Sequence, residues 1–171
     1  MKAGATPETM ARANVRWLLL ATAIVGADQL SKALLRSALP LGGVLPLTAF
    51  FNLVHAENPG AAFSFLAGAD GWQRWLFTAL GLGATALIVA LLRRPGRAMF
   101  GAGLACVLGG ALGNVIDRVL HGRVTDFLDF YVAHATTQWH WPAFNLADSA
   151  IAIGVALLLF DEWRSARART S

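Results

Sequence analysis

Two aspartates, Asp126 and Asp148, lie beside or inside segments of the chain that are apolar enough for a lipid bilayer. A carboxylate in such surroundings is costly, and charges found there usually serve a function. If the two groups lie close together they cannot both ionise easily, so they would share one proton. One could then activate a water molecule while the other polarises a carbonyl group. The pair could therefore carry out hydrolysis, or it could be scaffolding.

Both carboxylates also have a structural interpretation. Pro142 and Asn145 mark the start of a helix, which Asn145 can cap. Asp148 would then occupy the third helical position, where a negative charge favours the positive end of the helix dipole. Asp126 could be a loop residue paired with Arg123. Spacing alone therefore leaves catalysis and scaffolding open for both residues.

Other charged residues fall in the same kind of segment. Asp28 and Lys32 are four residues apart, so on a helix their side chains share one face and can pair. Asn114 and Asp117 share the face of another predicted helix. Asp117 lies near the end of that helix, where a negative charge opposes the dipole and needs a partner. Lys32 or Arg118 could supply it, so we expect a structural ion pair there rather than a catalyst.

The composition indicates a single small membrane domain over residues 1–171. The chain is 56% hydrophobic and 14% charged, whereas soluble domains are about one-quarter charged. The net charge of +4 could indicate nucleic-acid binding. However, the basic residues form neither a stripe nor a recognisable nucleic-acid-binding motif. Cys106, the single cysteine, rules out a disulfide within the chain and has no charged neighbours to activate it.

Four apolar segments have about the length needed to cross a bilayer as helices. They cover residues 15–35, 72–92, 98–120 and 144 to about 162. The first could instead be a cleaved signal peptide, but that would leave Asp28 and Lys32 unexplained. Gly109 and Gly113 have the spacing that lets two membrane helices approach closely. We therefore expect a membrane all-α fold with four transmembrane helices.

Lysines and arginines set the orientation of such helices, because cytoplasmic ends are enriched in them. Nine of the fourteen basic residues fall on one side of a four-helix array: Lys2, Arg12, Arg16, Arg93, Arg94, Arg97, Arg164, Arg167 and Arg169. Both termini should therefore be cytoplasmic, in a multi-pass membrane protein. The loops 36–71 and 121–142 would lie outside, and the polar residues named above would meet at one level near the outer face.

The two outer loops have distinct compositions. In the first, aromatic and β-branched residues flank the turn signal Asn58-Pro-Gly, which predicts a small antiparallel sheet. Asn58 could equally be an ordinary turn residue. The second carries Trp139 and Trp141, which favour a membrane interface. His121, His134 and His140 have no metal-ligand spacing, so we expect no metal site. The sequence indicates no cofactor.

Five blocks of sequence, in order, resemble the bacterial lipoprotein signal peptidases, also called signal peptidase II, a family of aspartic peptidases. The blocks are Asp28-Gln-Leu-Ser-Lys32, Asn58-Pro-Gly-Ala-Ala-Phe63-Ser, Gly109-Gly-Ala-Leu-Gly-Asn114-Val-Ile-Asp117-Arg118, Val124-Thr-Asp126-Phe127 and Phe144-Asn145-Leu-Ala-Asp148-Ser149. Together they span nearly the whole chain. Any one block would be weak evidence, but five in the order of the family are specific.

The resemblance implies an intramembrane aspartic endopeptidase that cleaves prolipoproteins just before a diacylglyceryl-modified cysteine. By position in the motifs, Asp126 and Asp148 match the catalytic pair of the family. Residues matching those that shape or line the site are Asp28, Lys32, Asn58, Asn114, Asp117, Arg118 and Asn145. The resemblance also implies a surface sheet between spans one and two and a lid-like segment, helical in the family, between spans three and four. The partners of such a protein would be lipid-modified prolipoproteins and membrane lipids. We expect a monomer that binds no nucleic acid.

Other classes of membrane protein fit the residues less well. A small proton-coupled transporter could use Asp28, Lys32, Asp117 and Asp148 as a relay, but it predicts polar residues through the whole membrane thickness. A lipid head-group transferase could bind a metal through Asp126 and Asp129 of Asp126-Phe-Leu-Asp129. The neighbouring glycines and further aspartates that such an enzyme would need are missing. A serine intramembrane protease would need a Gly-x-Ser-Gly block, which the sequence lacks.

Overall fold

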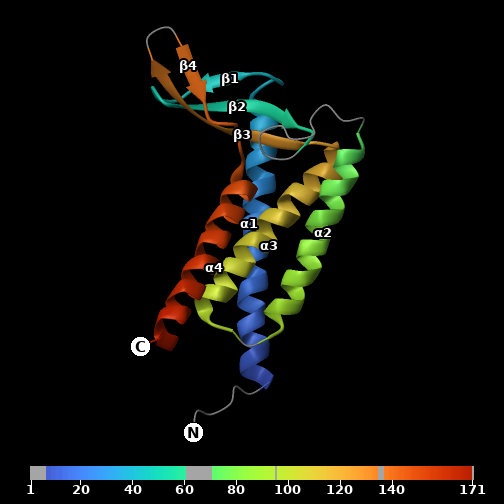
Figure 1. The fold of residues 1–171 in the computed structure, drawn as a ribbon. Coiled ribbons are helices and arrows are strands. Elements are labelled where there is room, and N and C mark those ends of the chain that lie inside the picture. Colours follow the sequence, from blue (N-terminus) through green and yellow to red (C-terminus); the bar gives the residue numbers. More distant parts are fainter. Residues whose placement is uncertain (1–6, 61–70, 95, 135–136, 171) are drawn as a thin grey trace.

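Four helices form a bundle, and four strands lie together at one end of it (Figure 1). The computed structural model describes residues 7–60, 71–94, 96–134 and 137–170. The helices are α1 (Pro7–Ala38), α2 (Trp72–Leu92), α3 (Ala98–His121) and α4 (Leu146–Thr170), and the strands are β1 (Val44–Pro46), β2 (Phe51–Asn58), β3 (Val124–His134) and β4 (Thr137–His140). At the end of the bundle away from the strands, α1 and α3 begin and α2 and α4 end.

Helix α3 is the centre of the bundle and packs against the other three helices. Glycines allow this close packing. A Cβ atom on Gly109 would lie 2.9 Å from the carbonyl oxygen of Ala21 on α1, and one on Gly110 would lie closer still to that of Ala147 on α4. Gly113 faces Asp28 in the same way. The predicted close approach at Gly109 and Gly113 is therefore confirmed, with α1 as a partner of both.

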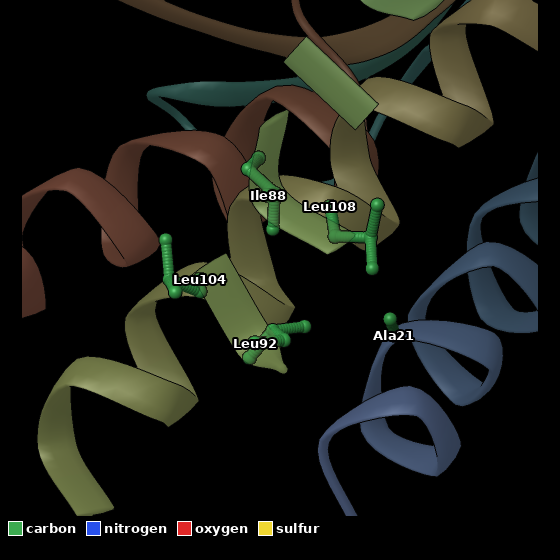
Figure 2. Close-up of a cluster of buried hydrophobic side chains, with 5 residues drawn as sticks. All are labelled: Ala21, Ile88, Leu92, Leu104 and Leu108. Atoms are coloured by element: carbon green, nitrogen blue, oxygen red, sulfur yellow. The ribbon is translucent and has the colours of Figure 1, made fainter. Parts of the chain in front are cut away.

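The distribution of side chains is the reverse of that in a soluble protein. Large apolar side chains are exposed around the bundle, among them Leu19, Leu30, Leu80, Leu87, Ile153 and Leu159, while the most completely buried large side chains are Lys32, Asn145, Asp28 and Asp117. Such an exposed apolar surface fits lipid rather than water. A small apolar core of Ala21, Ile88, Leu92, Leu104 and Leu108 lies between α1, α2 and α3 (Figure 2), in the half of the bundle where α2 ends and α3 begins.

Three of the four predicted spans are confirmed by length and apolar composition among the described residues. They are Val15–Ala38, Trp72–Leu92 and Ala98–His121. The segment expected at 144–162 forms α4, which begins at Leu146 and continues to Thr170. Helix α4 lacks the apolar composition of the other three candidate spans, because charged residues lie near both of its ends, from Asp148 to Arg169.

The strands form one antiparallel sheet in the order β1-β2-β3-β4. The predicted sheet between the first two spans is present, but the strands that form it differ from the expectation. Strand β2 pairs with β1 and with β3, which follows α3 in the chain. The second arm of the expected hairpin, including Phe63 and Phe65, lies outside the described residues. The described residues between 122 and 142 form β3 and β4, so the expectation of a helical lid there is wrong; the aromatic and β-branched run from Val124 to Val132 favours strand.

One extra residue in β2 changes the register beside Asp126. Leu53 pairs with Leu128, but the next pair along is Ala56 with Asp126, so β2 bulges between them. Bulges of this kind occur next to active sites, where they redirect a side chain. His55 holds this one in place: its Nδ1 lies 2.8 Å from the carbonyl oxygen of Leu39, at the end of α1.

The packing of α3 against α4 predicts that Gly110→Ala destabilises the protein. The added methyl group would meet the Ala147 carbonyl oxygen and Ile151, so the helices must separate. We expect a loss of about 1–3 kcal/mol, seen as a lower Tm in detergent. The matched control is Gly83→Ala on α2, where a Cβ meets nothing within 4 Å, and it should keep the parental Tm or raise it. A Gly110→Ala variant that melts with the parent would contradict the close packing.

Candidate active site

A cavity of about 450 Å³ lies under the sheet, beside the first turns of α4. Its polar lining comes from Asn58, Asn114, Arg118, Asp126 and Asp148, and the other lining residues are Val124, Trp141, Pro142, Ala143, Phe144, Ser149, Ile151 and Ala152. This volume is in the range of small-molecule and peptide side-chain sites. The two aspartates singled out in the sequence, 22 positions apart, therefore meet at one cavity.

Asp126 is held on β3 by two neutral amides. The Nδ2 group of Asn58, the last residue of β2, donates to one carboxylate oxygen at 3.2 Å. The Nδ2 group of Asn145 donates to the other at 2.8 Å. Burial, together with the negative charge of Asp148, raises the pKa of Asp126 to about 7, although both amides act in the opposite direction. This carboxyl group can therefore carry a proton at neutral pH.

Asp148 is held by the start of α4. The backbone N–H of Asp148 donates to Oδ1 of Asn145 at 2.9 Å, and the backbone N–H of Asn145 donates to Oδ2 of Asp148 at 3.2 Å. This reciprocal cap confirms the predicted helix start and fixes the orientation of the carboxylate. Asn114 donates to the other carboxylate oxygen at 2.8 Å. The helix dipole favours the ionised form of a group in this position.

Asn145 connects the two carboxylates. Its side-chain nitrogen donates to Asp126, and its side-chain oxygen accepts from the backbone of Asp148. The same nitrogen also lies 3.3 Å from Oδ1 of Asn114 and 3.3 Å from the carbonyl oxygen of Thr125. Asn145 is completely buried. One side chain therefore fixes the position of Asp126 relative to Asp148.

Beneath this layer lies a buried ion cluster centred on Lys32. Its Nζ is 2.9 Å from Asp28 and 3.0 Å from Asp117, and it donates to Oδ1 of Asn114 at 3.2 Å. These contacts use all three donors of the ammonium group. The side chains of Lys32, Asp28 and Asp117 are 0% exposed. The predicted pair of Lys32 with Asp28 is therefore confirmed, and of the two partners considered for Asp117 it is Lys32 that forms the ion pair.

The two aspartates of the cluster hold the elements that carry Asp126 and Asp148. Asp28 accepts the backbone N–H of Ala147 at 3.0 Å, at the start of α4. Asp117 accepts that of Thr125 at 3.1 Å, next to Asp126 on β3. The cluster thus ties α1 and α3 to both halves of the pair.

Arg118 lines the cavity and forms no ion pair with Asp117 among the described residues, although the sequence offered it as one of two possible partners. Its guanidinium group donates to the carbonyl oxygens of Asn114 at 3.3 Å and Gly60 at 3.1 Å. The backbone N–H of Gly60 in turn donates to Oδ1 of Asn58 at 2.9 Å. Arg118 therefore supports the turn that orients Asn58 toward Asp126.

Sequence reasoning missed two residues of this network. Arg36 lies 3.7 Å from Asp117 and donates to the Thr125 hydroxyl at 2.9 Å. Gln29 donates to Asp28 at 3.1 Å and to the carbonyl oxygen of Gly113 at 3.1 Å. The four-residue spacing from Lys32 could have indicated Arg36, because it continues the face of Asp28 and Lys32. The residues described contain no group of three or more His, Cys, Asp or Glu side chains that could hold a metal ion.

Comparison with known proteins gives consistent results. The family described as Signal peptidase (SPase) II matches residues 20–164. The chain is 54% identical over 152 residues to a lipoprotein signal peptidase of Burkholderia mallei, covering 88% of this chain and 89% of the relative. It is 56% identical, with the same coverage, to one of Paraburkholderia phymatum. A solved structure described as a bacterial membrane enzyme superposes with a TM-score of 0.76 at 27% identity, covering 88% of this chain and 89% of the other.

The ion cluster predicts that Lys32→Met destabilises the protein strongly. The substitution leaves two carboxylates buried without their shared cation, and breaking a buried pair in this way costs about 3–5 kcal/mol. The measurement is thermal unfolding in detergent. Adding Asp28→Asn and Asp117→Asn to the same variant removes the uncompensated charges and should recover part of the loss. A Lys32→Met protein as stable as the parent would show that the cluster does not hold the bundle.

Proposed function

This chain belongs to the signal peptidase II family, and from that premise we propose that Asp126 and Asp148 are its catalytic residues. Its function is that of a lipoprotein signal peptidase. One observation carries the proposal: both carboxylates line the same cavity and are linked through one buried side chain, Asn145. No other pair of carboxylates lines this cavity among the described residues.

The surroundings of the two carboxylates favour different roles. Asp148, at a helix start and hydrogen-bonded by Asn114, is the ionised partner and removes a proton from the attacking water. Asp126, whose pKa is raised to about 7, is the protonated partner and gives its proton to the oxygen of the scissile carbonyl. When the tetrahedral intermediate collapses, the proton held by Asp148 passes to the leaving nitrogen. As the carbonyl group re-forms, Asp126 takes the proton back from its oxygen, and the pair returns to its starting state with Asp126 protonated and Asp148 ionised.

The supporting residues act by position. Asn58 and Asn145 fix both oxygens of Asp126, and Asn114 and the α4 cap fix both oxygens of Asp148. Holding reacting groups in one geometry removes much of the entropic barrier to their reaction. Arg118 stabilises the turn at Asn58 and lines the cavity, where its cationic group can also orient the substrate backbone.

The proposed substrate is a prolipoprotein with a diacylglyceryl-modified cysteine, cleaved just before that cysteine. The cavity supports this because its wall on α4 is largely apolar, through Ile151 and Ala152, while its carboxylates lie at the sheet end of the bundle. The acyl chains could remain in lipid while the scissile bond reaches the pair. In this proposal the lipid is carried by the modified cysteine of the substrate.

We further propose that α4 is the fourth span, that both termini are cytoplasmic, and that the sheet and cavity lie at the outer face of the bacterial inner membrane. The arrangement of the helices supports this, because α1 and α3 begin and α2 and α4 end away from the sheet (Figure 1). The basic residues gathered at these helix ends suit the cytoplasmic side. A single chain supplies every residue of the site, so we propose that the enzyme acts as a monomer.

A proton-coupled transporter fits this arrangement less well. A relay requires polar groups through the membrane thickness. The buried ion cluster lies at the sheet end of the bundle, whereas Ala21, Ile88 and Leu104 lie in the opposite half (Figure 2).

The proposal predicts that Asp126→Asn and Asp148→Asn each lower cleavage by about 10²- to 10⁴-fold, because each removes one acid–base group. The measurement is cleavage of a purified lipid-modified prolipoprotein in mixed micelles. Glu162→Gln, at an exposed carboxylate on α4, makes the same chemical change far from the cavity and should keep the parental rate. Near-parental cleavage by either aspartate variant would refute the pair.

The raised pKa of Asp126 predicts the direction of the pH dependence. Below pH 7 this carboxyl is protonated and can act as the acid; above pH 7 it loses its proton. We therefore expect kcat/KM to fall as the pH rises through about 7. The fall should correspond to the loss of one proton in a plot of log(kcat/KM) against pH. The measurement is a pH profile on the same substrate, in the same micelles. A rate that increases steadily across this range would contradict the assignment of Asp126 as the acid.

A further inference from the structure

Asp129 has no part in the mechanism above, although it lies three residues after Asp126 on the same strand. Its carboxylate is buried and has two partners. The Nδ2 group of Asn52 on β2 donates to it at 2.8 Å, and Nδ1 of His140 on β4 lies 2.9 Å from both of its oxygens. Asp129 therefore connects three strands of the sheet.

The direction of its side chain separates Asp129 from the chemistry. Alternate residues of a strand point to opposite faces. Val124 and Asp126 line the cavity, whereas Thr125 does not. Asp129 falls on the face opposite to Asp126, so its carboxylate cannot reach the reacting atoms. Any effect of its side chain on the reaction must pass through its partners, and of these His140 adjoins residues that line the cavity.

His140 immediately precedes one wall of the cavity. This wall consists of the residues from Trp141 to Phe144, all of which line the cavity. It is fastened at both ends to β3: the backbone N–H of Trp141 donates to Phe130 at 2.8 Å, and that of Phe144 donates to Leu128 at 3.1 Å. Pro142 has no N–H with which to add a bond between them. The backbone hydrogen bonds described here therefore hold the wall at its two ends.

The end at His140 needs a specific anchor. Strand β4 has four residues, and all of them are exposed. So short a strand at the edge of a sheet has little packing to hold it. His140 supplies two contacts, the one with Asp129 and a stacking contact with Tyr131, whose ring centroid is 5.1 Å away.

We propose that Asp129 and His140 are positioning residues that fix the Trp141–Phe144 wall and thereby set the affinity for the peptide substrate. The inference rests on the proposed function, because it assigns the wall to the substrate cavity. The pair acts on binding and leaves the chemical step unchanged, since neither side chain contacts Asp126 or Asp148. In the Asp126-Phe-Leu-Asp129 motif, the first aspartate is catalytic and the second shapes the site.

The test separates KM from kcat. His140→Ala removes the donor to Asp129 at a half-exposed position, where the fold should tolerate it. We expect KM for the lipid-modified prolipoprotein to rise about tenfold, as for the loss of one hydrogen bond to a charged group, and kcat to stay within about twofold of the parent. His140→Asn places an amide N–H where Nδ1 was and should restore most of the affinity. Asp129→Asn should raise KM in the same direction as His140→Ala.

The matched control is Arg123→Gln, which removes the exposed ion pair of Arg123, just before β3, with Glu57 on β2 and should leave both constants unchanged. Three results would overturn the inference. They are an unchanged KM in His140→Ala, a fall in its kcat as large as the rise in its KM, and equal KM values for His140→Ala and His140→Asn. These outcomes are independent of the catalytic assignment. If the parent cleaves the substrate and Asp126→Asn does not, the proposed function stands whatever His140 does.

Discussion

The structure depends on one buried ammonium group, that of Lys32 between Asp28 and Asp117. A charge in this position is stable only while every partner remains in place, so the cluster specifies one arrangement of its elements. Each aspartate also accepts a backbone N–H, one at the start of α4 and the other on β3. These two elements carry Asp148 and Asp126. The ion cluster therefore sets the geometry of the cavity without lining it.

Neutral amides separate this cluster from the cavity, and the separation matters for the chemistry. Lys32 contacts Asn114, and Asn114 contacts Asp148. An ammonium group in ion-pair contact with both carboxylates would favour the ionised form of each, and the shared proton of the proposed mechanism would be lost. The amides of Asn58 and Asn145 instead fix Asp126 by hydrogen bonds while burial keeps its pKa near 7. Strong positioning is thus combined with a pair that can still exchange a proton.

Local sequence patterns predicted what local interactions determine. The apolar runs gave three spans, the four-residue spacing gave the Asp28–Lys32 pair, and Asn145 gave the start of α4. The spacing of the catalytic candidates could not show that they meet, and the family resemblance supplied that expectation. What the sequence did not reveal depends on contacts between distant segments: the pairing of β2 with β3, the bulge beside Asp126, and the strands found where a helical lid was expected. Strand partners are chosen by tertiary packing, which no single segment records.

The central claim is that the two carboxylates differ, with Asp126 protonated and Asp148 ionised. Infrared difference spectroscopy of the purified protein tests it directly, because a protonated carboxyl group has its own carbonyl stretching band. The account predicts a band that titrates near pH 7, is lost in Asp126→Asn, and survives in Asp148→Asn with a lower midpoint, since a neighbouring negative charge has been removed. A band that survives in Asp126→Asn and is lost in Asp148→Asn would reverse the roles and contradict the account.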